Sequence, residues 1–159
     1  MYELRKIDRT NIWKIVKLSV EKEQEDFVAT NTESILEAYA ESNSGGIALP
    51  FGLYEEGVPV GFVMFGYGTI GDEDEPSVAE NNYCLWRFMI DREYQHRGLG
   101  KKALAAAFDY IRTFPCGSAE YCWLSYEPEN KAAKALYNSF GFVENGETDG
   151  EEIVAVLKL

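Results

Sequence analysis

A basic turn that contains two glycines is the first place in this sequence where the residue types suggest chemistry. The segment QHRGLG, residues 95–100, is flanked by Arg92, Lys101 and Lys102, although the chain has 27 acidic residues, 15 lysines and arginines, and a formal net charge of −12. Where a strand enters a helix through such a turn, unpaired backbone N–H groups and the positive helix end converge on one point. Such a point binds phosphate, and Gly98 and Gly100 let an anion approach the backbone closely.

Two common nucleotide-binding motifs are absent from this turn. The segment QHRGLGKKAL contains neither GxGxxG nor GxxxxGK[ST], so a dinucleotide fold or a P-loop is not supported. A glycine-rich connection with solvated charges is the simplest alternative to an anion site. The combination of glycine turn, helix start and local positive charge favours the anion site over that alternative.

The elements that must position this turn follow from the hydrophobic pattern. YCLWRFMI, residues 83–90, predicts a strand that enters the turn, and KKALAAAFDYIRTF, residues 101–114, predicts the helix that leaves it. Strict alternation would place Trp86, Phe88 and Ile90 on one face of the strand and Leu85, Arg87 and Met89 on the other. Helical spacing predicts a buried stripe of Leu104, Ala107, Phe108 and Ile111.

The rest of the chain predicts a mixed α/β fold. We expect a first helix over residues 10–20 and a second that Thr32 caps, then a hairpin that turns at Glu56 and Gly57. Residues 69–82 are acidic and polar, which predicts an exposed loop. A strand over residues 119–126, a helix that Pro128 opens and that ends near Phe140, and a closing hairpin at Asp149 and Gly150 complete the order.

Bulk composition limits the class of protein. With 159 residues and 46% hydrophobic residues, we expect a single domain over residues 1–159. No segment resembles a membrane helix or a secretion signal, which predicts a cytoplasmic protein. Three cysteines without a CxxC pair indicate neither disulfides nor a metal site. The acidic balance argues against a nucleic-acid partner and favours a cationic small molecule.

Two motifs together resemble the GCN5-related N-acetyltransferases. The run Q-x-x-G-x-G over residues 95–100 resembles the acyl-CoA-binding signature of that family. The segment ENKAAKALYNSFGF, residues 129–142, is similar to the family's later N-x-x-A-x-x-x-Y-x-x-x-G-F helix. The resemblance covers essentially the whole chain, and it implies a central, mostly antiparallel sheet flanked by about four helices, with a splayed strand pair that holds the acyl-CoA.

The resemblance also implies roles for individual residues toward acetyl-CoA as co-substrate, with no metal. Backbone groups of Phe88, Met89 and Ile90 would pair with the pantetheine arm. Asn130 would hydrogen-bond the arm, and Tyr137, about two helical turns further on, would be the general acid. The Met89 N–H would stabilise the oxygen that becomes negative during the reaction. The pyrophosphate would be held by Gln95, His96, Arg97, Gly98, Leu99, Gly100 and Lys101.

The general base is not fixed by the motifs. At pH 7 only about one alkyl amine in 2,500 is neutral, so the attacking amine must lose a proton. Several polyamine-acetylating relatives carry a carboxylate just before the F-x-[IV] segment, whereas this chain has Trp86 and Arg87 there. Glu80 and the acids of EKEQEDF, residues 21–27, are the candidates for the base. Each has a simpler interpretation as a solvated surface acid.

The acceptor is expected to be a small-molecule amine. Much of the chain resembles bacterial spermine/spermidine (diamine) acetyltransferases, and Glu23, Glu25 and Asp26 would bind such a cation. Other amines remain as alternatives, namely a protein lysine or N-terminus, an aminoglycoside or an amino acid, and so does a non-catalytic acyl-CoA sensor. The final segment EEIVAVLKL predicts an apolar edge strand that invites a homodimer.

Overall fold

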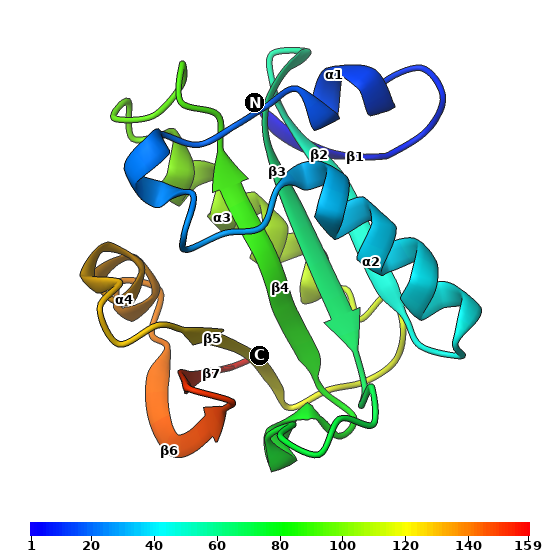
Figure 1. Ribbon diagram of the computed structural model, residues 1–159, viewed down its shortest axis with the longest axis vertical. Coiled ribbons are helices and arrows are strands. Elements are labelled where there is room, and N and C mark those ends of the chain that lie inside the picture. The colour runs from blue at the N-terminus through cyan, green and yellow to red at the C-terminus, as the bar shows by residue number, and fades with distance from the viewer.

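The computed structural model describes residues 1–159, and its seven strands form one mixed sheet in the order β1-β2-β3-β4-β5-β7-β6 (Figure 1). The strands are β1 Tyr2–Lys6, β2 Ala48–Glu55, β3 Val58–Tyr67, β4 Tyr83–Ile90, β5 Tyr121–Tyr126, β6 Val143–Asp149 and β7 Glu152–Lys158. The helices are α1 Ile12–Val16, α2 Asn31–Asn43, α3 Leu99–Ile111 and α4 Lys131–Asn138, with 3₁₀ turns at η1 Lys22–Gln24 and η2 Ser77–Ala79.

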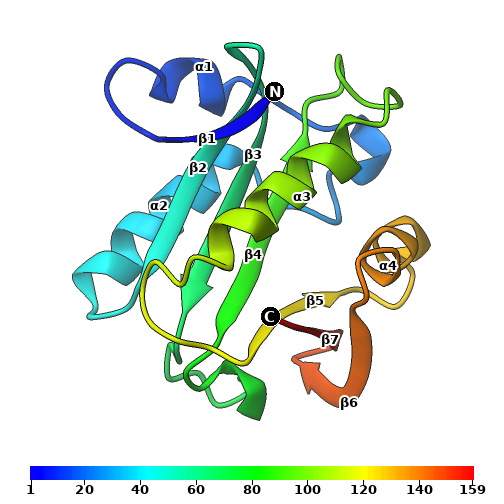
Figure 2. The same ribbon diagram turned by 180° about the vertical axis from the view of Figure 1, so that it is seen from behind.

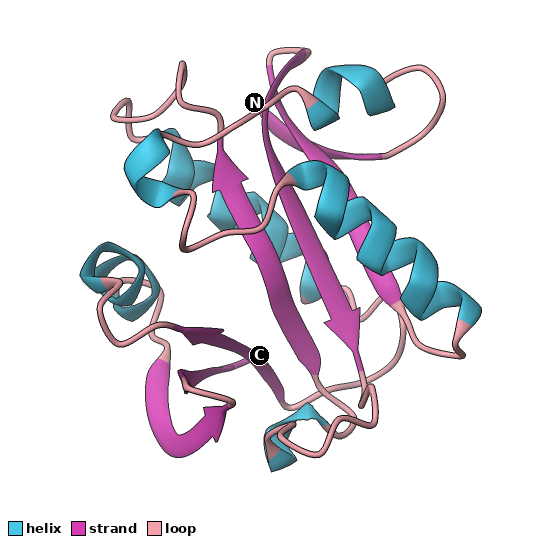
Figure 3. Cartoon of the chain, in the orientation of Figure 1, coloured by secondary structure: helices cyan, strands magenta, loops and turns pink.

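Helices cover both faces of the sheet (Figure 3). The larger core lies on the face of α3, which is seen in front of β2, β3 and β4 in Figure 2, and α4 packs against this same core. The predicted inward stripe of α3 is confirmed, because Leu104, Ala107, Phe108 and Ile111 are fully buried there. The smaller core lies beneath α1 and α2 on the other face and includes Ile15 and Ala38.

The central strands β4 and β5 separate along their length. They pair in parallel only through Tyr83 with Cys122 and Cys84 with Trp123, and every other neighbouring pair in the sheet is antiparallel. Figure 1 shows β5 turning away from β4 beyond this contact. The expected fold class, a mostly antiparallel sheet with four helices and a splayed strand pair, is therefore confirmed.

Strict alternation along β4 is wrong. Pairing of β3 with β4 shifts register between Met64 and Phe65, where Trp86 has no partner on β3. Leu85 packs in the α3-side core, whereas Trp86 packs against the α2-side core. Arg87 forms an ion pair with Glu37 on α2, at 3.0 Å. A β-bulge, in which one extra residue interrupts the period of two, thus turns both Trp86 and Arg87 toward α2.

Both N-terminal helices differ from their expected limits. The first ends at Val16 because the following chain is held elsewhere: the Ser19 N–H donates to the Asp91 carboxylate and the Ser19 carbonyl accepts from the Arg92 N–H, each at 2.8 Å. The second is capped by Thr30 rather than Thr32. Thr30 forms a capping box with Glu33, with two hydrogen bonds of 3.1 Å. Similarly, α4 begins after Asn130, its N-cap, and not at Pro128.

The ends of the sheet hold two further differences from the sequence analysis. The strand β1 was not predicted. Its polar residues Glu3, Arg5 and Lys6 are exposed, and the strand pairs antiparallel with β2. The closing hairpin at Asp149 and Gly150 is confirmed, but β7 is not an edge strand, because it lies between β5 and β6. The free edge at this end of the sheet is the mostly exposed β6, so a dimer through the apolar edge of β7 loses its basis. No helix has the length and apolar character needed to cross a bilayer.

Candidate active site

The separation of β4 and β5 opens a cleft of about 1190 Å³. Its walls come from both strands, the segment between α1 and α2, the start of α3, one face of α4 and the β6–β7 turn. These segments are distant in the sequence and meet only because the sheet divides here. Enzyme sites commonly lie in such concave regions.

The glycine turn at the start of α3 presents a row of free backbone donors to this cleft. None of the N–H groups of residues 95–101 donates a hydrogen bond to a protein acceptor. His96 and Gly98 both have a left-handed backbone, with φ of 63° and 71°, which helps to turn the amides toward one side. A Cβ built on Gly98 would meet no atom within 4 Å, so there is open space next to the amides. These observations fit the pyrophosphate of an acyl-CoA.

Side chains beside the turn hold it in place. Gln95 donates from Nε2 to the Ile90 carbonyl and to the Gln24 Oε1, both at 2.8 Å. The buried Asp91 accepts from the N–H groups of Ser19 and Glu93. Gln24 lies in the segment between α1 and α2, so this contact joins the predicted cofactor turn to a neighbouring segment that also lines the cleft.

The structure brings most of the predicted cofactor residues to the cleft. Phe88, Met89 and Ile90 line it from the part of β4 that is free of β5, and Gln95, His96, Gly98, Leu99 and Gly100 line it at the turn. Arg97 and Lys101 are exposed and do not line the cleft; the Arg97 guanidinium lies 5.6 Å from the Tyr94 ring centre instead. The donors that the turn offers to an anion therefore come from the backbone more than from basic side chains.

Helix α4 places Asn130 and Tyr137 in the same cleft. Asn130 Oδ1 accepts from the Ala133 N–H at 3.2 Å as the helix cap, which leaves its Nδ2 as a donor for a ligand. The Tyr137 ring stacks on Tyr126 with centres 6.5 Å apart and packs edge-on against Phe142. Burial, followed by the nearby Cys122, raises the pKa of Tyr137, so its hydroxyl is protonated at neutral pH.

The predicted acidic residues divide into two groups. Glu25 and Asp26 line the cleft, whereas Glu23 is exposed and does not. Glu80, one of the candidate bases, is also exposed, and it lies in a separate shallow depression beside Asn82 and Glu120. The preceding Ala79 is fully buried while Glu80 faces solvent, so the structure does not bring Glu80 to the cleft.

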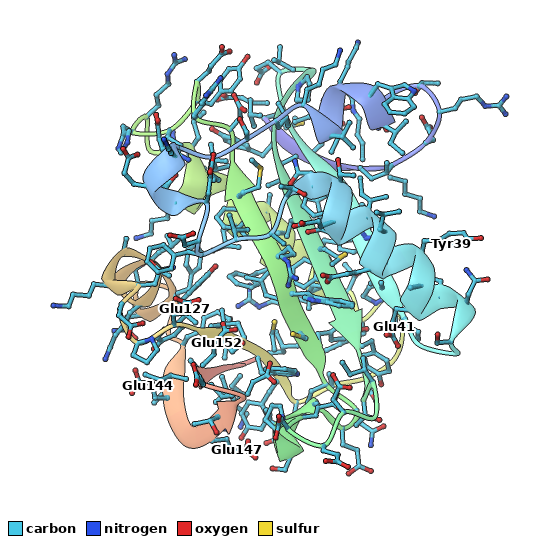
Figure 4. All side chains as sticks on the ribbon, viewed as in Figure 1. Tyr39, Glu41, Glu127, Glu144, Glu147 and Glu152 are labelled. Carbon is cyan, nitrogen blue, oxygen red and sulfur yellow. The ribbon has the colours of Figure 1, made fainter.

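Sequence reasoning missed a second acidic group, which lies at the β6–β7 turn. Asp149 and Glu152 line the cleft with Glu127 from the end of β5, and Figure 4 shows Glu127 and Glu152 in the region between α4 and the β6–β7 hairpin. The alternation of residues along β7 could have indicated this group. Ile153 and Ala155 enter the larger core, so Glu152 and Val154 lie on the opposite face of the strand. A hairpin signal by itself predicts only a structural role for this turn.

The surroundings of Asp149 and Glu152 disfavour the charged forms of their carboxyl groups. Burial first, and then Glu75, Asp72 and Asp74, raise the pKa of Asp149. Burial and then Asp149 raise the pKa of Glu152. Carboxylates whose pKa is raised by burial and by one another are typical of functional sites.

Comparison with known proteins places the chain in a family. The model of the acetyltransferase (GNAT) family matches residues 11–142. The chain is 41% identical over 110 residues to the spermine/spermidine N(1)-acetyltransferase of Bacillus subtilis strain 168, which covers 66% of this chain and 67% of that protein. A probable spermine N(1)-acetyltransferase of Bacillus subtilis subsp. natto matches over the same length with the same identity.

Solved structures share the fold. An aminoglycoside acetyltransferase AAC(6')-Ib in complex with coenzyme A has a TM-score of 0.76 at 16% identity, over 99% of this chain and 95% of that one. A PaiA N-acetyltransferase from Thermoplasma acidophilum, also with coenzyme A, has a TM-score of 0.66 at 19% identity, over 100% and 99% of the two chains. With the divided sheet, the free amides of the turn and the family match in agreement, this chain belongs to the acetyltransferase (GNAT) family and is an acetyl-CoA-dependent N-acetyltransferase.

Proposed function

We propose that this enzyme transfers the acetyl group of acetyl-CoA to a primary amine of a polyamine such as spermine or spermidine. The charge of the cleft carries the proposal: eight carboxylates line it, against one arginine and one histidine. Low-dielectric walls lined with one sign of charge concentrate ligands of the opposite sign. The two Bacillus subtilis relatives, named as acting on spermine or on spermine and spermidine, support the same acceptor class.

The single arginine of the cleft does not oppose a cationic acceptor. Arg87 is held by Glu37 through hydrogen bonds of 3.0 and 3.3 Å and donates to the Trp86 carbonyl at 3.0 Å. Its charge is therefore largely compensated within the protein. The remaining carboxylates leave the cleft strongly negative.

The proposed reaction is direct attack of the neutral amine on the thioester carbonyl. The sequence-based choice of the Met89 N–H is wrong, because the Asp91 N–H donates to the Val60 carbonyl on β3 and alternate residues of a strand point the same way, so Met89 also faces β3. The N–H of Phe88 or Ile90, on the free edge of β4, would instead donate to the carbonyl oxygen as it becomes negative. Tyr137 would donate its proton to the departing thiolate, a role that suits a hydroxyl kept protonated by burial. Asn130 and the backbone of residues 88–90 would hold the cofactor arm. The amine would pass its proton to Glu25 or Asp26, the candidate bases that line the cleft.

We also propose that the enzyme works in the cytoplasm. Its three cysteines are all free, and Cys122 is fully buried. Free thiols without disulfides are typical of proteins from reducing compartments.

A thiol-release assay with acetyl-CoA tests the acceptor class. The panel contains spermine, spermidine, 1,4-diaminobutane, an aminoglycoside and lysine peptides. We expect the highest kcat/KM for spermine or spermidine, and we expect their KM to rise with salt, because the attraction of the acidic cleft is screened. Activity confined to lysine peptides or to the aminoglycoside would contradict the polyamine proposal.

A further inference from the structure

Asp149 and Glu152 form a pair at one wall of the cleft, on both sides of the β6–β7 turn. The hydroxyl of Ser125 on β5 lies 3.5 Å from Asp149 Oδ2 and 3.4 Å from Glu152 Oε1. A hydroxyl has one proton and can donate to only one of the two carboxylates at a time. The protein therefore leaves at least three of the four carboxylate oxygens without a strong donor.

No salt bridge compensates this pair. The salt bridges of the protein involve Glu3, Glu37, Glu56, Asp109 and Glu144, and neither Asp149 nor Glu152 takes part in one. The charged groups that act on them are mostly acidic: Asp72, Asp74 and Glu75 raise the pKa of Asp149, and Glu127 raises the pKa of Glu152. Only Arg87, which is paired with Glu37, acts on Glu152 in the opposite direction. Partly buried carboxylates gathered in this way are favourable only when a cation joins them.

Trp123 gives a separate indication that this wall contacts a ligand. Its side chain is 6% exposed, it lines the cleft two residues before Ser125 on the same face of β5, and its indole N–H has no hydrogen-bond partner. A buried indole N–H normally finds an acceptor. The ligands of an acetyl transfer bring such acceptors in the carbonyl oxygens of the acyl cofactor and of the acetamide product. The wall is therefore built to meet a bound ligand even without considering its charge.

The chemistry of the reaction decides which part of the acceptor a carboxylate pair can bind. The attacking amine must be neutral, and carboxylates that hold an amine as a cation would keep it from attacking. A carboxylate pair therefore suits a group that stays charged throughout the reaction. In a polyamine, that group is any ammonium other than the one that is acetylated.

From these contacts we infer that Asp149 and Glu152 bind the unreacted ammonium group of the acceptor and make the enzyme prefer diamines and longer polyamines over monoamines. This inference rests on the proposed polyamine function. It assigns the β6–β7 turn a role in specificity and distinguishes it from the cofactor side of the cleft, where Tyr137 and Asn130 lie.

Two substrates with the same four-carbon chain isolate the interaction with the second ammonium group. 1,4-diaminobutane carries a second ammonium, and 1-aminobutane lacks it. We expect the wild type to favour the diamine in kcat/KM, and we expect Glu152→Gln and Asp149→Asn each to lower kcat/KM for the diamine about tenfold or more, mainly through KM. The values for 1-aminobutane should stay within about twofold of the wild type.

A matched variant controls for the charge change alone. Glu151→Gln removes one carboxylate from the same turn, but Glu151 is exposed and does not line the cleft. It should leave the preference for the diamine unchanged. Equal losses for both substrates in Glu152→Gln, or the same effect in Glu151→Gln, would overturn the inference, as would an unchanged diamine preference in both cleft variants.

A binding measurement separates this inference from the proposed function. If the wild type acetylates no polyamine, the proposed function fails, and calorimetry of spermidine with the CoA-loaded protein still tests the subsite. Affinity that falls about tenfold in Glu152→Gln supports the inference. Equal affinity in the wild type and Glu152→Gln overturns it.

Discussion

Replacement of Tyr137 by phenylalanine removes a single hydroxyl from the cleft with little disturbance of the packing. The ring keeps its stacking on Tyr126, at 6.5 Å and 24° between planes, and its edge-on contact with Phe142 at 5.8 Å. The hydroxyl makes no hydrogen bond within the protein, so none is lost. The free energy of unfolding should therefore change by less than about 1 kcal/mol.

The expected loss of turnover is much larger than the loss of stability. Proton transfer by a positioned side chain contributes about 10²–10⁴ in rate, so we expect kcat of Tyr137→Phe to fall about 100-fold or more. The affinity for acetyl-CoA should be unchanged, since the free amides of the turn remain. Because burial raises the pKa of Tyr137, wild-type kcat should show no alkaline loss from this group below about pH 10.

The matched control is Tyr126→Phe, which removes a neighbouring hydroxyl in the same aromatic stack. The Tyr126 hydroxyl donates to Glu144 at 2.7 Å, so this variant should lose stability through a broken hydrogen bond. Its kcat should fall by less than about tenfold. Steady-state thiol release, calorimetry with acetyl-CoA and thermal unfolding measure the three quantities. Turnover of Tyr137→Phe within about twofold of the wild type, or equal losses in both variants, would refute the role of Tyr137 as general acid.

Three further predictions concern the walls of the cleft. Gly98→Ala and Gly146→Ala each introduce a side chain at a residue with a left-handed backbone, where no atom lies within 4 Å of the new Cβ. Both should lower the free energy of unfolding by about 1–2 kcal/mol, as measured by thermal unfolding, but only Gly98→Ala should weaken acetyl-CoA binding in calorimetry. Gly61→Ala would place a Cβ 2.4 Å from the Met89 carbonyl oxygen, and the resulting shift of β4 should lower the free energy of unfolding by about 1–3 kcal/mol and raise KM for acetyl-CoA. An unaltered Tm and KM would contradict this prediction. Because burial and Asp149 raise the pKa of Glu152, the charged form of this carboxylate opposes folding above that pKa. Glu152→Gln should therefore raise Tm at pH 7 by about 1–3 °C. The difference should vanish near pH 3–4, where Glu152 is protonated in the unfolded chain as well. A lower Tm of Glu152→Gln at pH 7 would show that the carboxylate stabilises the fold.

The sequence was most informative where local chemistry determines local structure. A left-handed residue just before a helix favours glycine, and a helix start without bonded amides binds anions, so the residue types of 95–100 are enough to predict an anion site. The same holds for α3, whose apolar stripe repeats at helical spacing, and for the hairpin at Glu56 and Gly57. The spacing of Asn130 and Tyr137 placed both on one face of α4.

Sequence-based expectations failed where a distant contact overrides local preference. The first helix stops early because Ser19 bonds to residues 91 and 92, which directly follow β4 and are distant in the sequence. Alternation failed along β4 because a bulge against β3 turns Trp86 and Arg87 the same way. A pattern of period two cannot reveal a bulge, since the bulge depends on the partner strand.

The sequence by itself predicted the family, the proposed cofactor turn and the proposed acid on α4, because each depends on residues that are close together in the chain. Only the tertiary structure revealed the proposed acceptor side. It moved Glu80 out of the cleft, placed β7 between β5 and β6, and brought Asp149 and Glu152 to Ser125 and Trp123. Strand order and the separation of β4 from β5 arise from the packing of both cores at once, and no short segment of the chain encodes them.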